Sequence, residues 1–376
     1  MTAIIYPFND TLIPIIPHLA LPDFGESMLK VIDANRKYLH GKDIGYIKNQ
    51  PDTQICISDN LVDELKLCDV LIYMDENHEA ISDDIAIVDM QKAIRLQKKV
   101  ICLRNLPGDK VKELSELAAT IETEFHYLCN DVQNQERFVN YEIPFELYSP
   151  SASIIMVGET LEGLEGEHIC LSVADEMEAM GYHCVTVLES KYTQVLNAIP
   201  YPSFLRAGKS IESEKVYYLN NFLRKIDEIE NPDVIILHLP DPMMKYNQMF
   251  CNGFGIIPYL VSQAILPDCF ILCTQFEDVE AKFFDSLSAN FENRFGYGID
   301  FIHMSNMMFD IAISRATGKK KVSYYPQSKL DLLLCERFKD SCIPIFNGMN
   351  KEQCVRLVKA VMDMLASYNE NSSVLV

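Results

Sequence analysis

The chain has 376 residues, of which 48% are hydrophobic, so it is long enough for about two domains with sizeable buried cores. Its 54 acidic and 33 basic residues give a formal charge of −21. This charge argues against nucleic acid or an anionic membrane as a partner, because contacts to phosphate groups need clustered Lys and Arg.

The first residues, MTAIIYPFNDTLIPIIP, contain no basic segment followed by a continuous apolar one, so they do not predict a signal peptide. No stretch approaches the roughly 20 uninterrupted apolar residues of a membrane-spanning helix. Twelve cysteines in such a chain indicate reduced thiols rather than a disulfide framework. We therefore expect a cytoplasmic protein.

Residues 1–130 alternate short apolar runs with amphipathic segments, which is typical of a small Rossmann-like α/β domain with a parallel sheet. The pattern predicts strands at 3–6, 43–47, 69–74 and 100–104, and helices at 25–39, 83–99 and 109–128. Residues 131–152 lose the periodicity and gain Asn, Gln, Pro and Ser, so we predict that they link two domains.

Residues 153–376 restart the same rhythm with five apolar runs: SIIMVG, HCVTVLES, DVIILHLP, CFILCTQ and GIDFIHMSN. Ligands of open parallel sheets bind at the carboxyl ends of the strands, which gives the candidate binding residues Gly158, Glu189, Asp241, Gln275 and Asn306. An amphipathic helix, KEQCVRLVKAVMDMLASYNE, closes this domain. The predicted fold class is α/β, with two Rossmann-like or P-loop-like domains, mostly parallel sheets and helices on both faces.

The stretch SIIMVGETLEGLEGEHICLSVADEMEAMGYHCVTV, residues 153–187, has the layout of a nucleotide-binding unit: strand, glycine-containing loop, helix, strand. A phosphate loop of the form G-x-x-x-x-G-K-[ST] needs a lysine for phosphate and a hydroxyl for magnesium. Both registers of the loop lack that lysine, since acidic or apolar residues follow each second glycine. The candidate binding residues of the loop are Gly158, Glu159, Glu162, Gly163, Glu165, Gly166, Glu167 and His168.

The four glutamates of this loop are its dominant charge, because no basic residue lies between 158 and 167. One carboxylate and one phosphate charge about 4 Å apart repel each other by roughly 4 kcal/mol at an effective dielectric of about 20. We therefore predict a degenerate phosphate loop that does not bind a bare triphosphate in the usual way. The glutamates also suit a structural role at the positive end of a helix dipole.

A second landmark is NPDVIILHLPDPMM, which has the form of a Walker B strand, in which an Asp after an apolar strand holds magnesium. Asp241 is the candidate metal ligand, although Pro240, Asp241 and Pro242 would equally well turn the chain. Gly253 and Gly255 in NGFGII either let a ligand or partner approach closely or form a turn.

Two further segments limit the chemistry. The pair Cys269 and Cys273 in CFILC has no third cysteine nearby, so the chain is not predicted to be a radical SAM enzyme. The lysine-rich stretch ATGKKKVSYYPQSK, residues 316–329, is either a solvated loop or a docking patch for an acidic partner such as an acyl carrier protein.

The loop and the helix that follows it resemble P-loop proteins of the dethiobiotin synthetase and cobyrinate synthase type with an eroded catalytic loop. AIIYPFN, MVGETLEGLEGEHICLSVADEM and PDVIILHLPDPMM…GFGIIPYLVSQAILPDCFILC together resemble a family of two-domain peptide maturation system proteins from clostridial peptide natural-product clusters. The resemblance implies three partners, namely a Cys-rich precursor peptide, a radical SAM maturase and an acyl-carrier-like protein. It implies no catalytic residue.

Three hypotheses about function remain. The leading one is a non-catalytic accessory or recognition protein in the maturation of a ribosomally made peptide, whose acidic loop receives a basic partner segment. The alternative is a nucleotide- or small-ligand-binding enzyme of the P-loop ligase or synthetase type, which would use a nucleotide with magnesium at Asp241. The third is a structural subunit with a vestigial site. The sequence assigns no cofactor.

Overall fold

The computed structural model describes residues 1–20, 28–74, 81–128, 137–206, 210–277, 279–339 and 341–372. The chain divides into two compact units, the first formed by Met1–Asp131 and Gln194–Leu196 and the second by Val132–Thr193 and Asn197–Val376. Within the described ranges, every helix is too short or too polar to span a bilayer.

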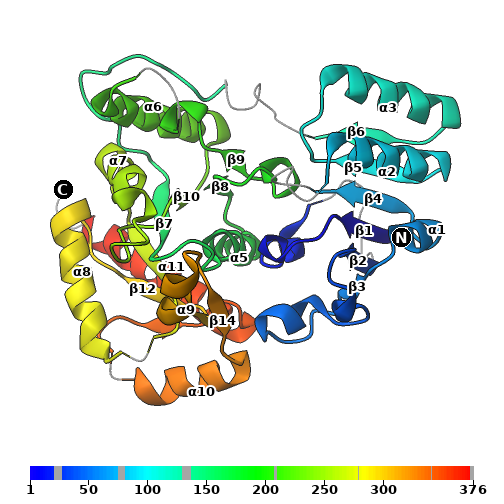
Figure 1. Ribbon diagram of the computed structural model, residues 1–376. Coiled ribbons are helices and arrows are strands. Elements are labelled where there is room, and N and C mark those ends of the chain that lie inside the picture. The colour runs from blue at the N-terminus through cyan, green and yellow to red at the C-terminus, as the bar shows by residue number, and fades with distance from the viewer. Residues whose placement is uncertain are drawn as a thin grey trace. The chain divides into compact units, whose positions relative to one another are not determined.

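The first unit is built on a sheet with the strand order β3-β2-β1-β4-β5-β6, and each neighbouring pair is parallel (Figure 1). Its strands are β1 Thr2–Tyr6, β2 Met28–Ile32, β3 Cys56–Ser58, β4 Val70–Tyr73, β5 Lys99–Cys102 and β6 Phe125–Tyr127. This is the strand order of dinucleotide-binding folds, in which the order reverses beside the first strand.

Helices α1 Leu61–Leu67, α2 Asp83–Arg95 and α3 Gly108–Ile121 connect these strands. Helix α1 begins where the Asn60 side chain accepts hydrogen bonds from the N–H groups of Val62 and Asp63. The apolar faces of the helices bury their side chains against the strands, and this core includes Ile4, Leu71, Met90, Ile94, Val100 and Leu114.

Two predicted elements of this unit are wrong, and a third, the helix 109–128, is too long, because α3 ends at Ile121 and Phe125–Tyr127 form β6. The segment 25–39 was expected to be a helix, but its residues Met28–Ile32 form β2, which pairs with β1 and β3; residues 25–27 lie outside the described part. The predicted strand 43–47 is replaced by a 3-10 helix at Ile44–Lys48. That helix starts because the carboxylate of Asp43 accepts the N–H of Gly45 at 2.7 Å, a local bond that competes with strand pairing.

The second unit contains a sheet with the order β15-β12-β11-β7-β10-β8-β9, whose neighbouring strands are parallel. Its strands are β7 Ser153–Glu159, β8 Cys184–Leu188, β9 Ile199–Pro200, β10 Val234–His238, β11 Cys269–Thr274, β12 Phe301–Met304 and β15 Ile345–Phe346. A separate antiparallel pair is formed by β13 Met307–Phe309 and β14 Val322–Tyr324. The central strand β7 thus lies between β10 and β11.

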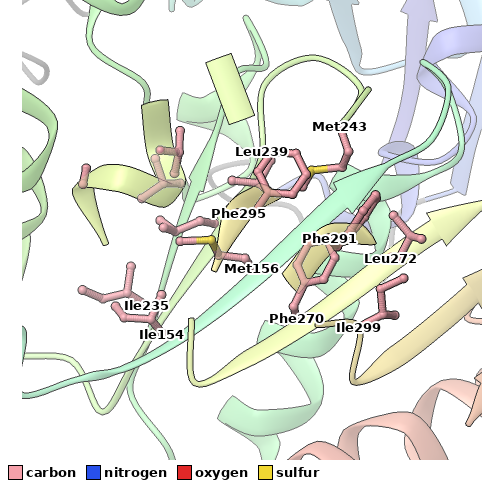
Figure 2. Packing of buried hydrophobic residues seen from close by; sticks show 14 of the residues in the cluster. Ile154, Met156, Ile235, Leu239, Met243, Phe270, Leu272, Phe291, Phe295 and Ile299 are labelled. Carbon is pink, nitrogen blue, oxygen red and sulfur yellow. The ribbon is translucent and has the colours of Figure 1, made fainter. Parts of the chain in front are cut away.

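Helices cover both faces of this sheet (Figure 1). The helices of the second unit are α5 Gly166–Ala179, α6 Glu212–Glu230, α7 Ile256–Ala264, α8 Ala281–Phe295, α9 Ile311–Thr317, α10 Gln327–Arg337 and α11 Lys351–Ser372. Alternate side chains of the central strands point to opposite faces. Met156 of β7 and Phe270 of β11 belong to the cluster that includes Phe291 and Phe295 of α8, and Figure 2 shows this packing.

The described part of the predicted linker, residues 137–152, packs on α6 of the second unit. Phe138 is buried in the main core cluster, and the N–H of Tyr148 donates to Asn220 at 2.8 Å. The carboxylate of Asp227 accepts bonds from the Tyr148 hydroxyl at 2.6 Å and from the N–H of Ser151 at 2.9 Å. These bonds fix the chain where it enters β7.

Candidate functional site

The carboxyl ends of β7, β8, β10, β11 and β12 lie along one edge of the second sheet, because these strands are parallel. This edge carries the residues that the sequence predicted as a site. Hydrogen bonds and ion pairs arrange them in three groups, namely the loop between β7 and α5, a cluster around Arg206, and a polar group around Gln275.

The loop between β7 and α5 wraps around its own glutamate. The Glu159 carboxylate accepts the N–H of Gly163 at 3.1 Å through Oε2 and the N–H of Gly166 at 2.7 Å through Oε1. Gly163 and Glu165 both have left-handed backbone conformations, with φ of 87° and 64°, and these turn the loop back toward Glu159. Backbone N–H groups before a helix are the groups with which a phosphate loop cradles its anion. Here a side-chain carboxylate of the same loop accepts them.

Close packing against neighbouring side chains explains two glycines, Gly158 near the end of β7 and Gly166 at the start of α5. A Cβ atom on Gly166 would lie 2.5 Å from His238 Nε2 and 2.7 Å from Glu159 Oε1. A Cβ atom on Gly158 would lie 2.6 Å from the Met243 sulfur. By contrast, a Cβ atom on Gly163 would meet no atom within 4 Å, so that glycine serves the left-handed turn.

Burial dominates the electrostatics of Glu159, which is 7% exposed. It raises the pKa of the Glu159 carboxyl to about 7, and the neighbouring Glu165 acts in the same direction. The backbone bonds from Gly166 and Gly163 and the charge of Lys320 oppose this rise. Burial also lowers the pKa of His238 to about 4, so this imidazole is neutral near pH 7.

Two imidazoles face the loop carboxylates, His303, which is fully buried, and His238, which is 13% exposed. His238 Nε2 lies 3.9 Å from Glu159 Oε1, and His303 Nε2 lies 3.6 Å from Glu165 Oε2. Because His303 Nδ1 accepts the N–H of Gly348 at 2.9 Å, the proton of this imidazole lies on Nε2, which points at Glu165. The sequence did not single out His303.

The other loop candidates differ in exposure. Glu159 and Glu165 are buried, Glu162 is exposed and Glu167 is half-buried, so only the last two reach a partner at the surface. His168 is buried and lies 3.3 Å from the Ser172 hydroxyl, one turn along α5. The ammonium of Lys320 donates to the carbonyl oxygen of Glu162. A lysine from the predicted basic stretch therefore belongs to this loop, although 158 residues separate the two in sequence.

The second group is a bridge of charges between β8 and β10. The Arg206 guanidinium donates to both carboxylate oxygens of Glu189, at 2.5 Å for Oε2, and to Asp241 Oδ2 at 2.7 Å. These bonds raise the pKa of Arg206 further above its already high value. Asp241, predicted as a magnesium ligand, is thus occupied by an ion pair with a residue that the sequence did not single out.

Gly253 and Gly255 lie in the segment that follows this bridge. A Cβ atom on Gly253 would lie 3.2 Å from Asp241 Oδ2, and one on Gly255 would lie 2.0 Å from the Met243 carbonyl oxygen. Both glycines have positive φ, so they let the segment return over the end of β10. The N–H of Met243 donates to the Glu159 carbonyl oxygen at 2.8 Å and ties this segment to the loop.

The third group lies at the ends of β11 and β12. Gln275 donates to the Tyr246 hydroxyl at 2.7 Å and to Glu277, and it accepts the N–H of Phe309 at 3.0 Å. Asn306 donates to the Tyr325 carbonyl at 2.8 Å. These buried amides hold the β13–α9–β14 segment against the sheet.

The described residues contain no group of three or more His, Cys, Asp or Glu side chains arranged to hold a metal ion. The polar atoms at the strand ends are instead engaged with one another, with the two imidazoles facing the loop as the main exception.

No family model and no curated protein matches the sequence. Among solved structures, a DUF1611 family protein from Anabaena variabilis is similar, with a TM-score of 0.57 and 10% identity over 96% of this chain and 99% of that chain. Chloroplast FtsY from Physcomitrella patens covers 81% of this chain and 92% of its own at 12% identity, with a TM-score of 0.31, which is too low to support an argument. The first likeness shows the fold alone, and with the two mostly parallel sheets it confirms the predicted α/β class.

Proposed function

We propose that the protein is a non-catalytic accessory or recognition protein in the maturation of a ribosomally made peptide in the cytoplasm. In this proposal the second unit keeps the fold of a nucleotide-binding domain, but the loop that would bind phosphate is closed by its own Glu159 side chain. The observation that carries the non-catalytic part is the position of the Glu159 carboxylate, which accepts the N–H groups of Gly163 and Gly166.

This position works against a nucleotide in two ways. An incoming phosphate would first have to displace two hydrogen bonds to a carboxylate, each worth about 1.5–3 kcal/mol when the acceptor is charged. It would then approach a loop with further negative charge on Glu162, Glu165 and Glu167, which repels phosphate by several kcal/mol at short range. Both terms oppose binding of ATP or GTP.

The alternative enzyme, with a nucleotide and magnesium at Asp241, has less support. A magnesium ion at Asp241 would have to displace the Arg206 guanidinium, which also holds both oxygens of Glu189. The loop next to it offers neither the hydroxyl nor the lysine that usually complete a magnesium–phosphate site.

The peptide-maturation part of the proposal rests on the sequence resemblance, which implies a precursor peptide, a radical SAM maturase and an acyl-carrier-like protein as partners. The exposed Glu162 and half-buried Glu167 offer negative charge to a basic segment of such a partner. The buried Glu159 and Glu165 are not available for that role.

A thermal-shift titration with ATP, GTP and ADP in the presence of magnesium tests the non-catalytic part. We expect no rise in melting temperature at millimolar nucleotide, because the loop is closed. Specific binding at about 100 times Kd would add roughly 2.7 kcal/mol to stability. A saturable, magnesium-dependent rise would overturn this part and favour the enzyme.

A pull-down with the tagged precursor peptide tests the recognition part. The tagged peptide should retain at least several-fold less of the double variant Glu162→Gln/Glu167→Gln than of the wild type. The control variant Glu113→Gln/Glu116→Gln loses the same charge from exposed positions on α3 of the first unit, and the peptide should retain as much of it as of the wild type. Equal retention of all three proteins would contradict recognition through the acidic loop.

A further inference from the structure

We propose that α9 and the turn that follows it form a docking surface for an acidic amphipathic segment of another protein. This surface, the α9 patch, consists of Ile311, Ile313, Arg315, Lys319 and Lys321. The inference goes beyond the proposed function, whose acidic loop receives a basic segment, and it does not depend on that role of the loop.

Helix α9 (Figure 1) is exposed on nearly all sides. Of its seven residues, Ile311–Thr317, only Ser314 is buried. Ile311 and Ile313 are 39% and 51% exposed. Two exposed isoleucines alone would be ordinary, but apolar side chains rimmed by a cluster of charges of one sign are typical of a surface that binds a partner.

The cations of the α9 patch are not neutralised by neighbouring carboxylates. No acidic residue lies between 311 and 330, in a chain whose formal charge is −21. Arg315, Lys319 and Lys321 are exposed and have no ion-pair partner among the described residues, whereas Arg206 and Arg224 each pair with a glutamate. An acidic partner would therefore find cations that no carboxylate of the described chain already occupies.

The backbone of the α9 patch is held in place by hydrogen bonds. The Asp310 carboxylate caps α9 by accepting the N–H of Ile313 at 2.8 Å. The Ser314 hydroxyl accepts the N–H of Lys321 at 2.8 Å, and the N–H of Asp310 donates to the Lys321 carbonyl oxygen at 2.9 Å. Such a short helix is not stable in water by itself, so these bonds maintain it. A preformed surface loses less conformational entropy when a partner binds.

A protein segment suits the α9 patch better than a membrane or a nucleic acid does. Those two carry negative charge over a wide area, so they would also face acidic residues beside the patch. One of these is the exposed Glu162, whose carbonyl oxygen accepts a hydrogen bond from Lys320. A short acidic segment can contact the patch alone, with its carboxylates on the three cations and its apolar residues on Ile311 and Ile313.

Fluorescence anisotropy with a fluorescein-labelled helical peptide of repeated Glu-Glu-Leu-Leu units tests the inference on the full chain at low salt. We expect saturable binding by the wild type. The triple variant Arg315→Ala/Lys319→Ala/Lys321→Ala should bind the peptide roughly tenfold more weakly, because it lacks the three cations. The double variant Ile311→Ala/Ile313→Ala should bind roughly threefold more weakly, because it lacks the apolar contacts.

The matched control is Lys351→Ala/Arg356→Ala/Lys359→Ala, which removes the same charge from exposed positions on α11 of the same unit and should bind the peptide like the wild type. Circular dichroism and melting temperature check that each variant folds. If the first triple variant does not fold, Lys319→Gln/Lys321→Gln, which leaves α9 unchanged, takes its place.

Equal losses in the two triple variants, or no saturable binding of the peptide by the wild type, would overturn the inference. Binding to phosphatidylserine vesicles without binding to the peptide would also overturn it and would assign the α9 patch to a membrane. None of these results changes the titrations with nucleotides or the pull-down with the precursor peptide, so failure of the inference is distinguishable from failure of the proposed function.

Discussion

The loop between β7 and α5 and the bridge around Arg206 satisfy strand-end carboxylates in two different ways. In the loop, Glu159 is buried and its charge is received by backbone N–H groups only four and seven residues further along the chain. In the bridge, Asp241 is partly exposed and its charge is received by a guanidinium 35 residues away. The first arrangement fixes the backbone of the loop, whereas the second joins the side chains of Glu189 and Asp241 through Arg206.

The two carboxylates therefore contribute to the structure in different ways. A buried carboxyl that accepts backbone N–H groups is costly to ionise. It is also hard to replace without changing the shape of the loop. A pair of half-exposed charges is screened by solvent and contributes little to stability, although it controls which other cation can approach Asp241. Variants that act on one region and spare the other should therefore differ in size and in their dependence on pH and salt.

The largest effect is expected for Gly166→Ala. The new methyl group would overlap with Glu159 Oε1 and His238 Nε2, both buried, so the loop must open or Glu159 must give up its bond to Gly166. Overpacking of this kind costs about 1–3 kcal/mol, and we expect roughly 3 kcal/mol here, measured by urea unfolding of the second unit.

The matched control is Gly163→Ala, where the new methyl group meets open space and only the left-handed backbone is strained, at about 1 kcal/mol. If both variants lose the same stability, the loop is not packed around the Glu159 carboxylate as described.

A smaller effect, with a definite pH dependence, is expected for Glu159→Gln. The pKa of Glu159 rises from 4.5 to about 7 on folding, so the folded protein binds the proton more tightly and its stability falls as pH rises between these values. Ionising the Glu159 carboxyl in the folded protein costs roughly 3 kcal/mol of stability at high pH. Gln avoids this cost, but it loses about 1 kcal/mol because its amide nitrogen cannot accept the N–H of Gly163. Glu159→Gln should therefore be more stable than the wild type by roughly 2 kcal/mol at pH 8, and no more stable at pH 5.

Melting temperatures of the two proteins between pH 5 and pH 8 check this expectation, with the exposed Glu162→Gln as the control that follows the wild-type curve. Parallel curves for Glu159→Gln and the wild type would show that position 159 does not carry a buried charge.

The fold could be predicted from the sequence where an element has one strong pattern. The apolar runs that became β7, β8, β10, β11 and β12 are short and end in polar residues, so their type and position were evident. The segment 25–39 was mistaken for a helix because its apolar residues also fit helical spacing. Pairing with β1 and β3 decides in favour of a strand at Met28–Ile32, and such tertiary pairing leaves no mark in local sequence.

The loop between β7 and α5 could be located from the sequence, but its internal contacts could not. The glycine spacing marked the loop, and its glutamates predict that it is not an ordinary phosphate loop. That Glu159 turns into the loop depends on left-handed conformations at Gly163 and Glu165, and the second of these is unusual for a residue with a side chain. Arg206 and Lys320 act across 35 and 158 residues, separations over which a single sequence carries no signal of contact.

The smallest effect is expected for Arg206→Ala, which tests the exposed side of the comparison. The Arg206 side chain is 45% exposed, so its pairs with Glu189 and Asp241 are screened and should contribute about 1 kcal/mol or less. The loss of stability should shrink in about 1 M salt, where the Debye length falls to about 3 Å. The effect of Glu159→Gln on stability should persist in the same salt, because the Glu159 carboxyl is buried. Arg224→Ala, which removes an exposed arginine paired with Glu228 along α6, is the control and should change stability less than Arg206→Ala. A large, salt-independent loss of stability in Arg206→Ala would mean that the ion pairs of the bridge stabilise the strand ends as strongly as the loop does. The two regions would then not differ in the way described.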